Sequence, residues 1–331
     1  WCEDIHFEGC TFKDSWYNEN LQGSYSHHIS GIGIVPQSVH RLFVNNCFFT
    51  QIKGNAAIHW NTYDKSGYFE ITNNLFYLTC FGSVCLFAFQ AEFPKMRCKV
   101  SGNQFIGSGL GDLPPEYLAG MPEHERGVGC AALLGGNGAD VAPRKQHAIC
   151  ENNVFIDCCE SSIEGPAWNP CIGNSCYGQG TLQDEENCRL MEKKYKLDYK
   201  LQVRYNPSVN FIYRYCTKED YDPDDPMVFS DNVMGRSYVD RDGFIALPGV
   251  YASPVVFTNN TLDTPDTTKI QTHILFAQFL NGFRFENNHD IYPYFNQCLV
   301  KGDFIIDEFN AQWQSNFDDA NLITNRSRER F

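Results

Sequence analysis

The sequence predicts an all-β fold, a right-handed parallel β-helix in which short strands stack as a solenoid. Three observations lead to this prediction. An Asn-containing turn recurs about every 28 residues, apolar and polar residues alternate with period two before each turn, and the 3.6-residue periodicity of helical solenoids is absent. A chain of 331 residues is long enough for two ordinary domains or one elongated solenoid, because solenoids escape the usual limit on core size.

Each turn consists of an apolar–polar alternation, then Asn-Asn or Gly-Asn, then an aromatic or aliphatic residue one or two positions later. The intervals between successive turns are 28, 29, 50, 79, 28 and 28 residues, so two stretches keep register and two carry insertions. Residues 5–12 form a degenerate first copy. The second Asn of the turn falls at Asn46, Asn74, Asn103, Asn153, Asn232, Asn260 and Asn288.

The chemistry of asparagine explains this repeat. Each bend between parallel strands needs a left-handed backbone conformation, which Asn tolerates better than most residues. Its side-chain amide can then bind the Asn of the next turn, which predicts an internal ladder. The period-two alternation places Val, Ile, Phe and Cys inward and Glu, Thr and Ser outward.

A second strand follows each turn. Aligning the apolar residues of these strands predicts one inward column and, one position later, one outward column. The inward column contains Ile58, Leu86, Ile163 and Ile245. The outward column contains His59, Phe87, Glu164 and Ala246.

The repeat also predicts the domain organisation. Residues 1–305 form the β-helix, with insertions at 111–127 and 165–226, and residues 306–331 form a C-terminal cap or tail. The larger insertion contains a stretch near 184–197 with helical character. Long loops in compact domains are usually functional or disordered, and both insertions leave the middle of the solenoid. We therefore expect them to form the walls of a cleft there.

Composition narrows the choice of partners. The net charge of −14 disfavours nucleic acid and anionic membrane surfaces, which would repel the protein, and it fits a neutral glycan best. No apolar run approaches the ~20 residues of a membrane span. The aromatic content of 15% fits either sugar-binding surfaces or rings stacked inside the solenoid. Walker, GxSxG and HExxH motifs are missing.

The 15 cysteines leave the redox compartment open. Five of them lie in apolar runs and are expected to be buried thiols, namely Cys47, Cys85, Cys98, Cys130 and Cys150. Three others lie in an irregular segment, where a disulfide or a metal site is the alternative, namely Cys171, Cys176 and Cys188. Because no CxxC pair and no His at zinc spacing supports a metal site, we expect neither a metal nor a cofactor.

The densest acidic segment is 156–166, and it supplies the first catalytic candidates. Hydrolysis of a glycosidic bond uses two carboxyls, one protonated and one ionised. Asp157, Glu160 and Glu164 straddle one predicted turn, so two of them could approach to the separation of roughly 5–10 Å that glycosidases use. Glu164 is the sharpest candidate, because it follows an inward Ile and precedes the long insertion. The alternative is that all three are solvated turn carboxylates.

A second group of candidates lies one predicted rung further along. Asp240 or Asp242 would be a natural partner of Glu164 if it faced the same cleft, and Arg241 could orient a substrate hydroxyl or carboxylate. The alternative is an ordinary turn, because Asp-Gly is a common turn signal.

The remaining candidates are substrate-binding residues. His28 and His59 could line the N-terminal part of a groove, and Trp60 and Trp168 could stack on sugar rings. For the histidines the alternative is an incidental position on the surface. For the tryptophans it is a position as caps of rungs.

The Asn turns quoted above resemble those of the right-handed parallel β-helix proteins of the pectate-lyase superfold, over most of residues 1–300. Residues 7–16 and 160–165 are similar to secreted gut-bacterial β-helix glycoside hydrolases of the fucosidase and lacto-N-biosidase kind. This resemblance implies hydrolysis of an oligo- or polysaccharide by paired carboxylates and an extracellular or cell-surface location. The chain departs from pectate lyases in lacking their Lys/Arg-plus-Asp calcium constellation.

The same superfold also carries other functions, so a second hypothesis stays open. It is a glycan-binding β-helix of the phage-tailspike or adhesin type, trimeric if it is a tailspike, with or without depolymerase or lyase activity. In both hypotheses the partner is a carbohydrate, and neither nucleic acid nor a membrane is expected.

Overall fold

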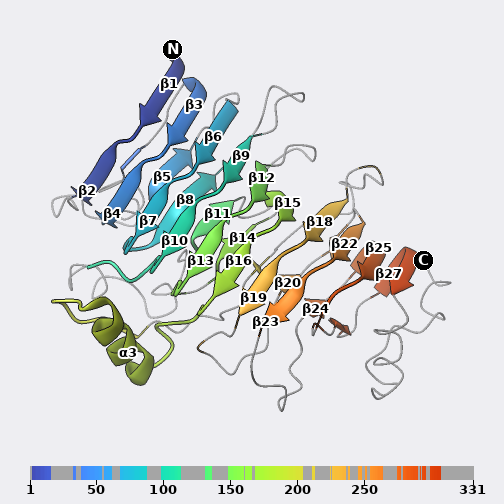
Figure 1. The fold of residues 1–331 in the computed structure, drawn as a ribbon. Coiled ribbons are helices and arrows are strands. Elements are labelled where there is room, and N and C mark those ends of the chain that lie inside the picture. The colour runs from blue at the N-terminus through green and yellow to red at the C-terminus, as the bar shows by residue number, and fades with distance from the viewer. Residues whose placement is uncertain are drawn as a thin grey trace.

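The computed structural model describes 27 strands and one helix. The residues described are 2–15, 33–34, 39–53, 56–61, 68–87, 98–112, 131–135, 148–159, 161–165, 168–203, 211–212, 224, 226–235, 238, 245–247, 250–251, 254–263, 274–276, 279–289, 291, 293–295 and 299–306. The strands form three sheets in which every pairing is parallel, and the single described helix lies beside them (Figure 1). The fold is therefore all-β, as the sequence predicts.

Sheet A has eleven strands. They are β1 (Cys2–Glu8), β3 (Val39–Asn45), β6 (Tyr68–Thr72), β9 (Lys99–Ser101), β12 (Ala148–Glu151), β15 (Trp168–Ile172), β18 (Met227–Ser230), β21 (Val250–Tyr251), β22 (Val255–Thr258), β25 (Phe279–Glu286) and β27 (Leu299–Ile306).

Sheets B and C have eight strands each. Sheet B contains β2 (Thr11–Ser15), β4 (Phe48–Ile52), β7 (Leu75–Tyr77), β10 (Gln104–Ile106), β13 (Val154–Ile156), β16 (Ser175–Tyr177), β19 (Val233–Gly235) and β23 (Thr261–Asp263). Sheet C contains β5 (Ala56–Asn61), β8 (Gly82–Phe87), β11 (Leu133–Gly135), β14 (Ile163–Glu164), β17 (Phe211–Ile212), β20 (Ile245–Leu247), β24 (Ile274–Phe276) and β26 (Pro293–Phe295).

Over most of the described chain, consecutive strands pass from sheet A to sheet B to sheet C and then return to sheet A. We call one such passage a rung. Neighbours within a sheet therefore come from successive rungs, as in β3, β6 and β9 (Figure 1). This arrangement is compatible with the predicted parallel β-helix.

The predicted asparagine ladder is present at the turns between sheets A and B. The side-chain N–H of Asn103 donates to the side-chain oxygen of Asn153 at 3.0 Å, and its second N–H donates to the carbonyl of Ile71 at 2.8 Å. The same contacts recur in each rung, and every ladder side chain is buried. The ladder consists of Asn74, Asn103, Asn153, Asn174, Asn232, Asn260 and Asn288.

At these turns, two adjacent residues have the two roles that the sequence predicts for a single Asn. One takes the left-handed conformation, and the next joins the ladder. The residue before each ladder Asn takes the left-handed conformation, with φ between 54° and 67°. Asn46 has this role, so its predicted place in the ladder is wrong. The rung of Asn46 presents the backbone N–H of Cys47 to Asn74 instead, at 2.8 Å. The left-handed residues are Asn46, Asn73, Gly102, Asn152, Gly173, Asp231, Asn259 and Asn287.

Stacked phenylalanine rings fill the core under the first rungs of sheet B. Successive ring centroids lie 4.7–4.8 Å apart, which is the spacing of neighbouring strands. At this position, rings stacked inside the fold explain part of the high aromatic content. The stack consists of Phe12, Phe49, Phe76, Phe105 and Phe155.

The predicted insertion at 165–226 is wrong for residues 168–177. Strands β15 and β16 pair with β12 and β13, and Asn174 joins the ladder, so these residues complete a rung. This rung was missed because Asn174 follows Asn153 by 21 residues, which is shorter than the repeat. The chain leaves the stack after β16 and forms helix α3 (Glu185–Tyr195), within the stretch predicted to be helical.

Twelve of the cysteines lie in the described part of the chain, and no disulfide joins any two of them. The expected buried thiols Cys47, Cys85, Cys98 and Cys150 are buried, whereas Cys130 lies outside the described residues. Cys171, Cys176 and Cys188 are also buried, and no disulfide joins them, so the alternative of a disulfide among these three is wrong. No helix in the described part of the chain is long and apolar enough to cross a membrane.

Candidate functional site

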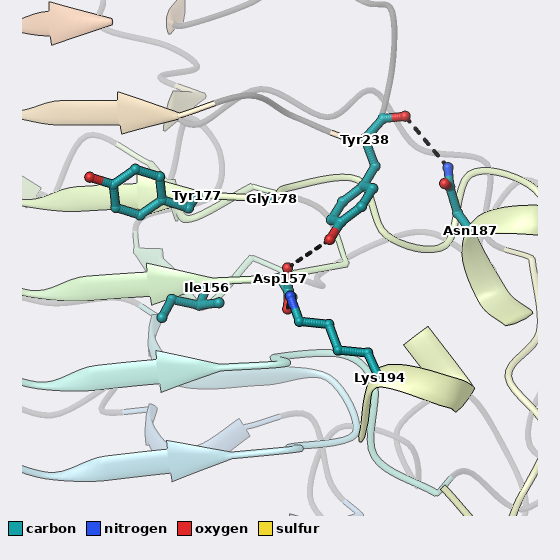
Figure 2. Close-up of a pocket in the computed structure, with 7 residues that line it drawn as sticks. All are labelled: Ile156, Asp157, Tyr177, Gly178, Asn187, Lys194 and Tyr238. Atoms are coloured by element: carbon teal, nitrogen blue, oxygen red, sulfur yellow. Dashed lines mark hydrogen bonds and ion pairs between the residues drawn. The ribbon is translucent and has the colours of Figure 1, made fainter. Parts of the chain in front are cut away.

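A cavity of about 550 Å³ lies where the chain leaves sheet B at the ends of β13 and β16. Its volume is within the range of small-molecule sites, roughly 300–1,000 Å³. Helix α3 lies beside it, and Figure 2 shows Lys194 reaching from that helix to Asp157. The described lining consists of Ile156, Asp157, Tyr177, Gly178, Asn187, Lys194 and Tyr238.

Asp157 is the central charge of this cavity. It is the first residue after β13, has φ of 53° and is only 2% exposed. Its Oδ2 accepts a hydrogen bond from the hydroxyl of Tyr195 and lies 2.5 Å from Nζ of Lys194. Its Oδ1 accepts from the hydroxyl of Tyr238 at 3.2 Å. A buried carboxylate thus receives three donors, which compensates for its removal from water.

These contacts change the ionisation of the donors. Burial raises the pKa of Tyr195, and its hydrogen bond to Asp157 raises it further. Burial and the charge of Asp157 raise the pKa of Tyr238 in the same way. Burial alone would lower the pKa of Lys194, but its hydrogen bond and charge interaction with Asp157 outweigh this and raise it. Both phenols therefore stay protonated and Lys194 stays charged at neutral pH.

Helix α3 positions two of these donors. Asp184 caps its N-terminus by accepting from the backbone N–H of Asn187 at 2.7 Å. Acidic residues in the first turn and basic residues in the last turn, Lys194 among them, complement the helix dipole. The buried side chains Cys188 and Met191 pack in an apolar cluster with residues of the turns after β7 and β10. This packing holds Lys194 and Tyr195 over Asp157.

Gly178 makes room for the carboxylate. Its φ is 70°, and a Cβ at this position would lie 2.5 Å from Oδ1 of Asp157. It would also lie 3.0 Å from a ring carbon of Tyr238. A glycine is therefore required both by the backbone conformation and by the close approach.

The cavity offers a ligand several kinds of contact. Asp157 and Lys194 form an ion pair of zero net charge, so the site does not select strongly for a charged ligand. The side chain of Lys194 is 45% exposed and keeps N–H groups available to a ligand. Tyr177 and Tyr238 contribute aromatic surface beside these polar groups. A neutral molecule with many hydroxyl groups suits this combination.

Glu164 and His59 share a column of sheet C, as predicted. The register runs from His59 through Cys85 and Leu134 to Glu164. The prediction that Phe87 belongs to this column is wrong, because Cys85 takes that place and Phe87 pairs with Asn61. Likewise Val84, and not Leu86, pairs with Ile58. Three strand spacings, about 14 Å, separate His59 from Glu164.

Three residues of this column are closed to solvent. His59, Cys85 and Glu164 are 2%, 1% and 4% exposed. Burial and, secondarily, the charge of Glu164 raise the pKa of Cys85. Glu164 does not belong to the described lining of the Asp157 cavity. The structure therefore places Glu164 and Asp157 on the same rung without bringing them together in one described cavity.

Trp168 does not stack on a ligand. It is 1% exposed and belongs to the main hydrophobic core, and its indole N–H donates to the carbonyl of Glu164 at 3.2 Å. Its predicted role in substrate binding is therefore wrong, because no face of the ring is accessible. Trp60 lies on β5, and its side chain is not described. The remaining candidates lie outside the described residues, namely Glu160, Asp240, Arg241, Asp242 and His28.

Asp157 is the one residue of this site that was a candidate from the sequence. The residues that were missed include Tyr177, Gly178, Asn187, Lys194, Tyr195 and Tyr238. Lys194 and Tyr195 lie within the helical stretch predicted near 184–197, but no spacing rule connects that stretch with Asp157. Tyr177 stands where the repeat places an outward residue of a strand, and that strand itself was missed. Tyr238 carries no pattern that distinguishes it.

Metal binding finds no support in the described part of the chain. No three His, Cys, Asp or Glu side chains there are grouped as metal ligands would be. Comparison with known protein families, with curated proteins and with solved structures finds no match.

Proposed function

We propose that the protein is a right-handed parallel β-helix that binds a neutral oligo- or polysaccharide in the Asp157 cavity and hydrolyses it. The observation that carries the proposal is the cavity itself, in which a buried carboxylate, a lysine and two tyrosine rings meet beside a parallel sheet. Sugars present hydroxyl groups to polar partners and C–H faces to aromatic rings, and this lining offers both.

Hydrolysis requires a second carboxyl group. Glu160 and Glu164 follow Asp157 closely in the sequence, and both stay candidates for that role. Asp157 would then be the ionised partner, since Lys194 and two tyrosine hydroxyls donate to its two oxygens and offer no acceptor for a carboxyl proton. The second carboxyl would protonate the leaving group.

Glycan binding without hydrolysis is the second candidate, and one observation favours it. Three donors of the protein already engage both oxygens of Asp157. A carboxylate held in this way is suited to fixing helix α3 and shaping a binding site. The trimeric state expected of a tailspike, and the extracellular location, belong to this proposal as predictions.

A glycan array followed by product analysis tests both candidates. Wild type, Asp157→Asn and Glu164→Gln are screened for binding, and bound glycans are incubated and analysed for new reducing ends. Hydrolysis by wild type and binding without turnover by Glu164→Gln support the hydrolase. Binding without turnover by wild type supports the second candidate. Absence of glycan binding by the folded wild type overturns both.

A further inference from the structure

We infer that Tyr177 and Asp263 form a second sugar subsite, so that the ligand is a linear neutral glycan lying along the stack of rungs. This inference rests on the proposed function and extends it beyond the cavity around Asp157. The juxtaposition that carries it is the ring of Tyr177 lying against Gly235, with the carboxylate of Asp263 in the rung beyond.

The register of sheet B places these residues in one outward column. Ile156 pairs with Tyr177 in the next rung. In the following rungs Gly235 pairs with Asp263 at the ends of β19 and β23. The column therefore begins at the cavity lined by Ile156 and Tyr177 and extends away from it, over three strand spacings of about 14 Å in total.

The ring of Tyr177 can lie against Gly235 because this residue has no side chain. A Cβ at Gly235 would lie 2.2 Å from Cδ1, 2.9 Å from Cε1 and 3.2 Å from Cγ of Tyr177. One edge of the ring thus rests where any other residue would project a side chain. Gly235 is buried, whereas Tyr177 remains half-buried. The ring therefore covers the neighbouring rung and keeps part of its own surface accessible.

Asp263 lies at the end of β23, two strands beyond β16 in sheet B. Burial raises the pKa of Tyr177, and the charge of Asp263 raises it further. Asp263 itself is exposed. A sugar ring placed on Tyr177 could donate its hydroxyl groups to the carboxylate of Asp263. The next sugar of the chain would then lie toward the Asp157 cavity. Figure 2 shows Tyr177 beside the cluster around Asp157, with its hydroxyl directed away from it.

The geometry favours binding by Asp263 over catalysis. Asp263 stands three rungs beyond Ile156, whose neighbour is Asp157, and this separation exceeds the roughly 5–10 Å between the carboxyls of glycosidases. In the described column of Ile156, Tyr177, Gly235 and Asp263, the one charged group is the carboxylate of Asp263, which would repel an acidic sugar. A neutral chain therefore fits the column better than a polyuronate.

The test compares glycans of different length. The probes are neutral β-1,4-linked gluco-, manno- and xylo-oligosaccharides from disaccharide to hexasaccharide, and their affinities are measured by titration calorimetry. For the series that binds, wild type is expected to bind the hexasaccharide about tenfold more tightly than the disaccharide, a gain typical of one aromatic contact. Tyr177→Leu is expected to abolish that gain, and it should weaken disaccharide binding as well, because Tyr177 also lines the Asp157 cavity.

Two further variants keep the result interpretable. Asp263→Asn changes an exposed side chain, is expected to fold, and should reduce only the affinity for long glycans. Gly235→Ala should displace the ring of Tyr177 and have the effect of Tyr177→Leu, with circular dichroism reporting whether the variant folds. Equal affinities of wild type for short and long glycans, or an unchanged hexasaccharide affinity in both Tyr177→Leu and Asp263→Asn, overturn the subsite and leave the proposed function standing. If no probe binds at any length, the proposed function for these glycans fails as well.

Discussion

Asn103 donates its side-chain N–H to the side-chain oxygen of Asn153, 50 residues further along the chain and buried at 0% exposure. The backbone N–H of Asn103 donates to the same oxygen at 3.0 Å. That backbone bond survives in Asn103→Leu, but the buried backbone N–H of Asn74 and the carbonyl of Ile71, both in the preceding rung, lose the Asn103 side chain as a partner. Each such group costs about 1–3 kcal/mol, so we expect Asn103→Leu to lower the free energy of unfolding by at least about 2 kcal/mol. Urea denaturation followed by circular dichroism measures it.

Asn152→Gly is the matched control for the ladder. Asn152 has φ of 54° and is exposed, and the equivalent residues in two other rungs are Gly102 and Gly173. Glycine suits that conformation, so this variant should change stability by less than about 1 kcal/mol. A loss as large as that of Asn103→Leu would show that the turn conformation matters as much as the ladder.

The ladder also shows how far the sequence alone could lead. The repeat of Asn46, Asn74 and Asn103 was sufficient to predict parallel rungs, since few folds repeat at this spacing with period-two alternation. It was not sufficient to separate the left-handed residue from the ladder residue, because Asn suits both roles. The rung at Asn174 escaped notice because its loop is shorter than the others. Residue type alone also gave the wrong register in sheet C. Val84 and Leu86 are both apolar, so the sequence could not show which of them pairs with Ile58.

The site was less predictable than the fold for a physical reason. Asp157 was found because acidic residues crowd one turn. Its partners Lys194, Tyr195 and Tyr238 come from segments 37 or more residues away, whose positions depend on how helix α3 packs. The period-two alternation predicts which side chains point outward, but it does not predict whether other segments cover them. Glu164 was therefore expected at the surface, although it is buried.

Gly178→Ala should destabilise the protein more than Gly9→Ala. Both glycines have positive φ, 70° and 63°, so both variants carry a backbone cost of about 1 kcal/mol. A Cβ at Gly9 meets no atom within 4 Å, whereas one at Gly178 meets Oδ1 of Asp157 at 2.5 Å. Thermal unfolding should show an additional loss of about 1–3 kcal/mol for Gly178→Ala. Equal losses in the two variants would contradict the proposed close fit around Asp157.

Labelling with a thiol reagent should distinguish surface from core cysteines. Cys2 is exposed and should react within minutes at pH 8. Burial raises the pKa of Cys98 and Cys158 to about 12, so neither provides thiolate under these conditions. We expect the fast phase to contain Cys2 and the half-buried Cys10, and the remaining described thiols to react only in denaturant. Mass spectrometry of labelled peptides identifies each, and rapid labelling of Cys158 in the native protein would contradict its burial.

Alkaline solution should loosen helix α3 through the phenols that bind Asp157. The pKa values of Tyr195 and Tyr238 are raised in the folded protein, and the ordinary tyrosine value is about 10. Below that pH both states keep the proton, so the full stabilisation is present. As pH rises toward the folded pKa values, the unfolded chain releases protons that the folded chain retains, and stability falls. The melting temperature of wild type should therefore decline steeply above about pH 10.

Tyr195→Phe separates this effect from the titration of buried thiols, which begins at lower pH and is common to both proteins. The variant loses a hydrogen bond to Asp157 and should be less stable at pH 7. Since it has one titrating phenol fewer, the gap between its melting temperature and that of wild type should narrow from pH 9 to pH 11. A gap that stays constant over this range would show that Tyr195 ionises with the same pKa in the folded and unfolded states. The contact with Asp157 would then not hold the phenol in its protonated form.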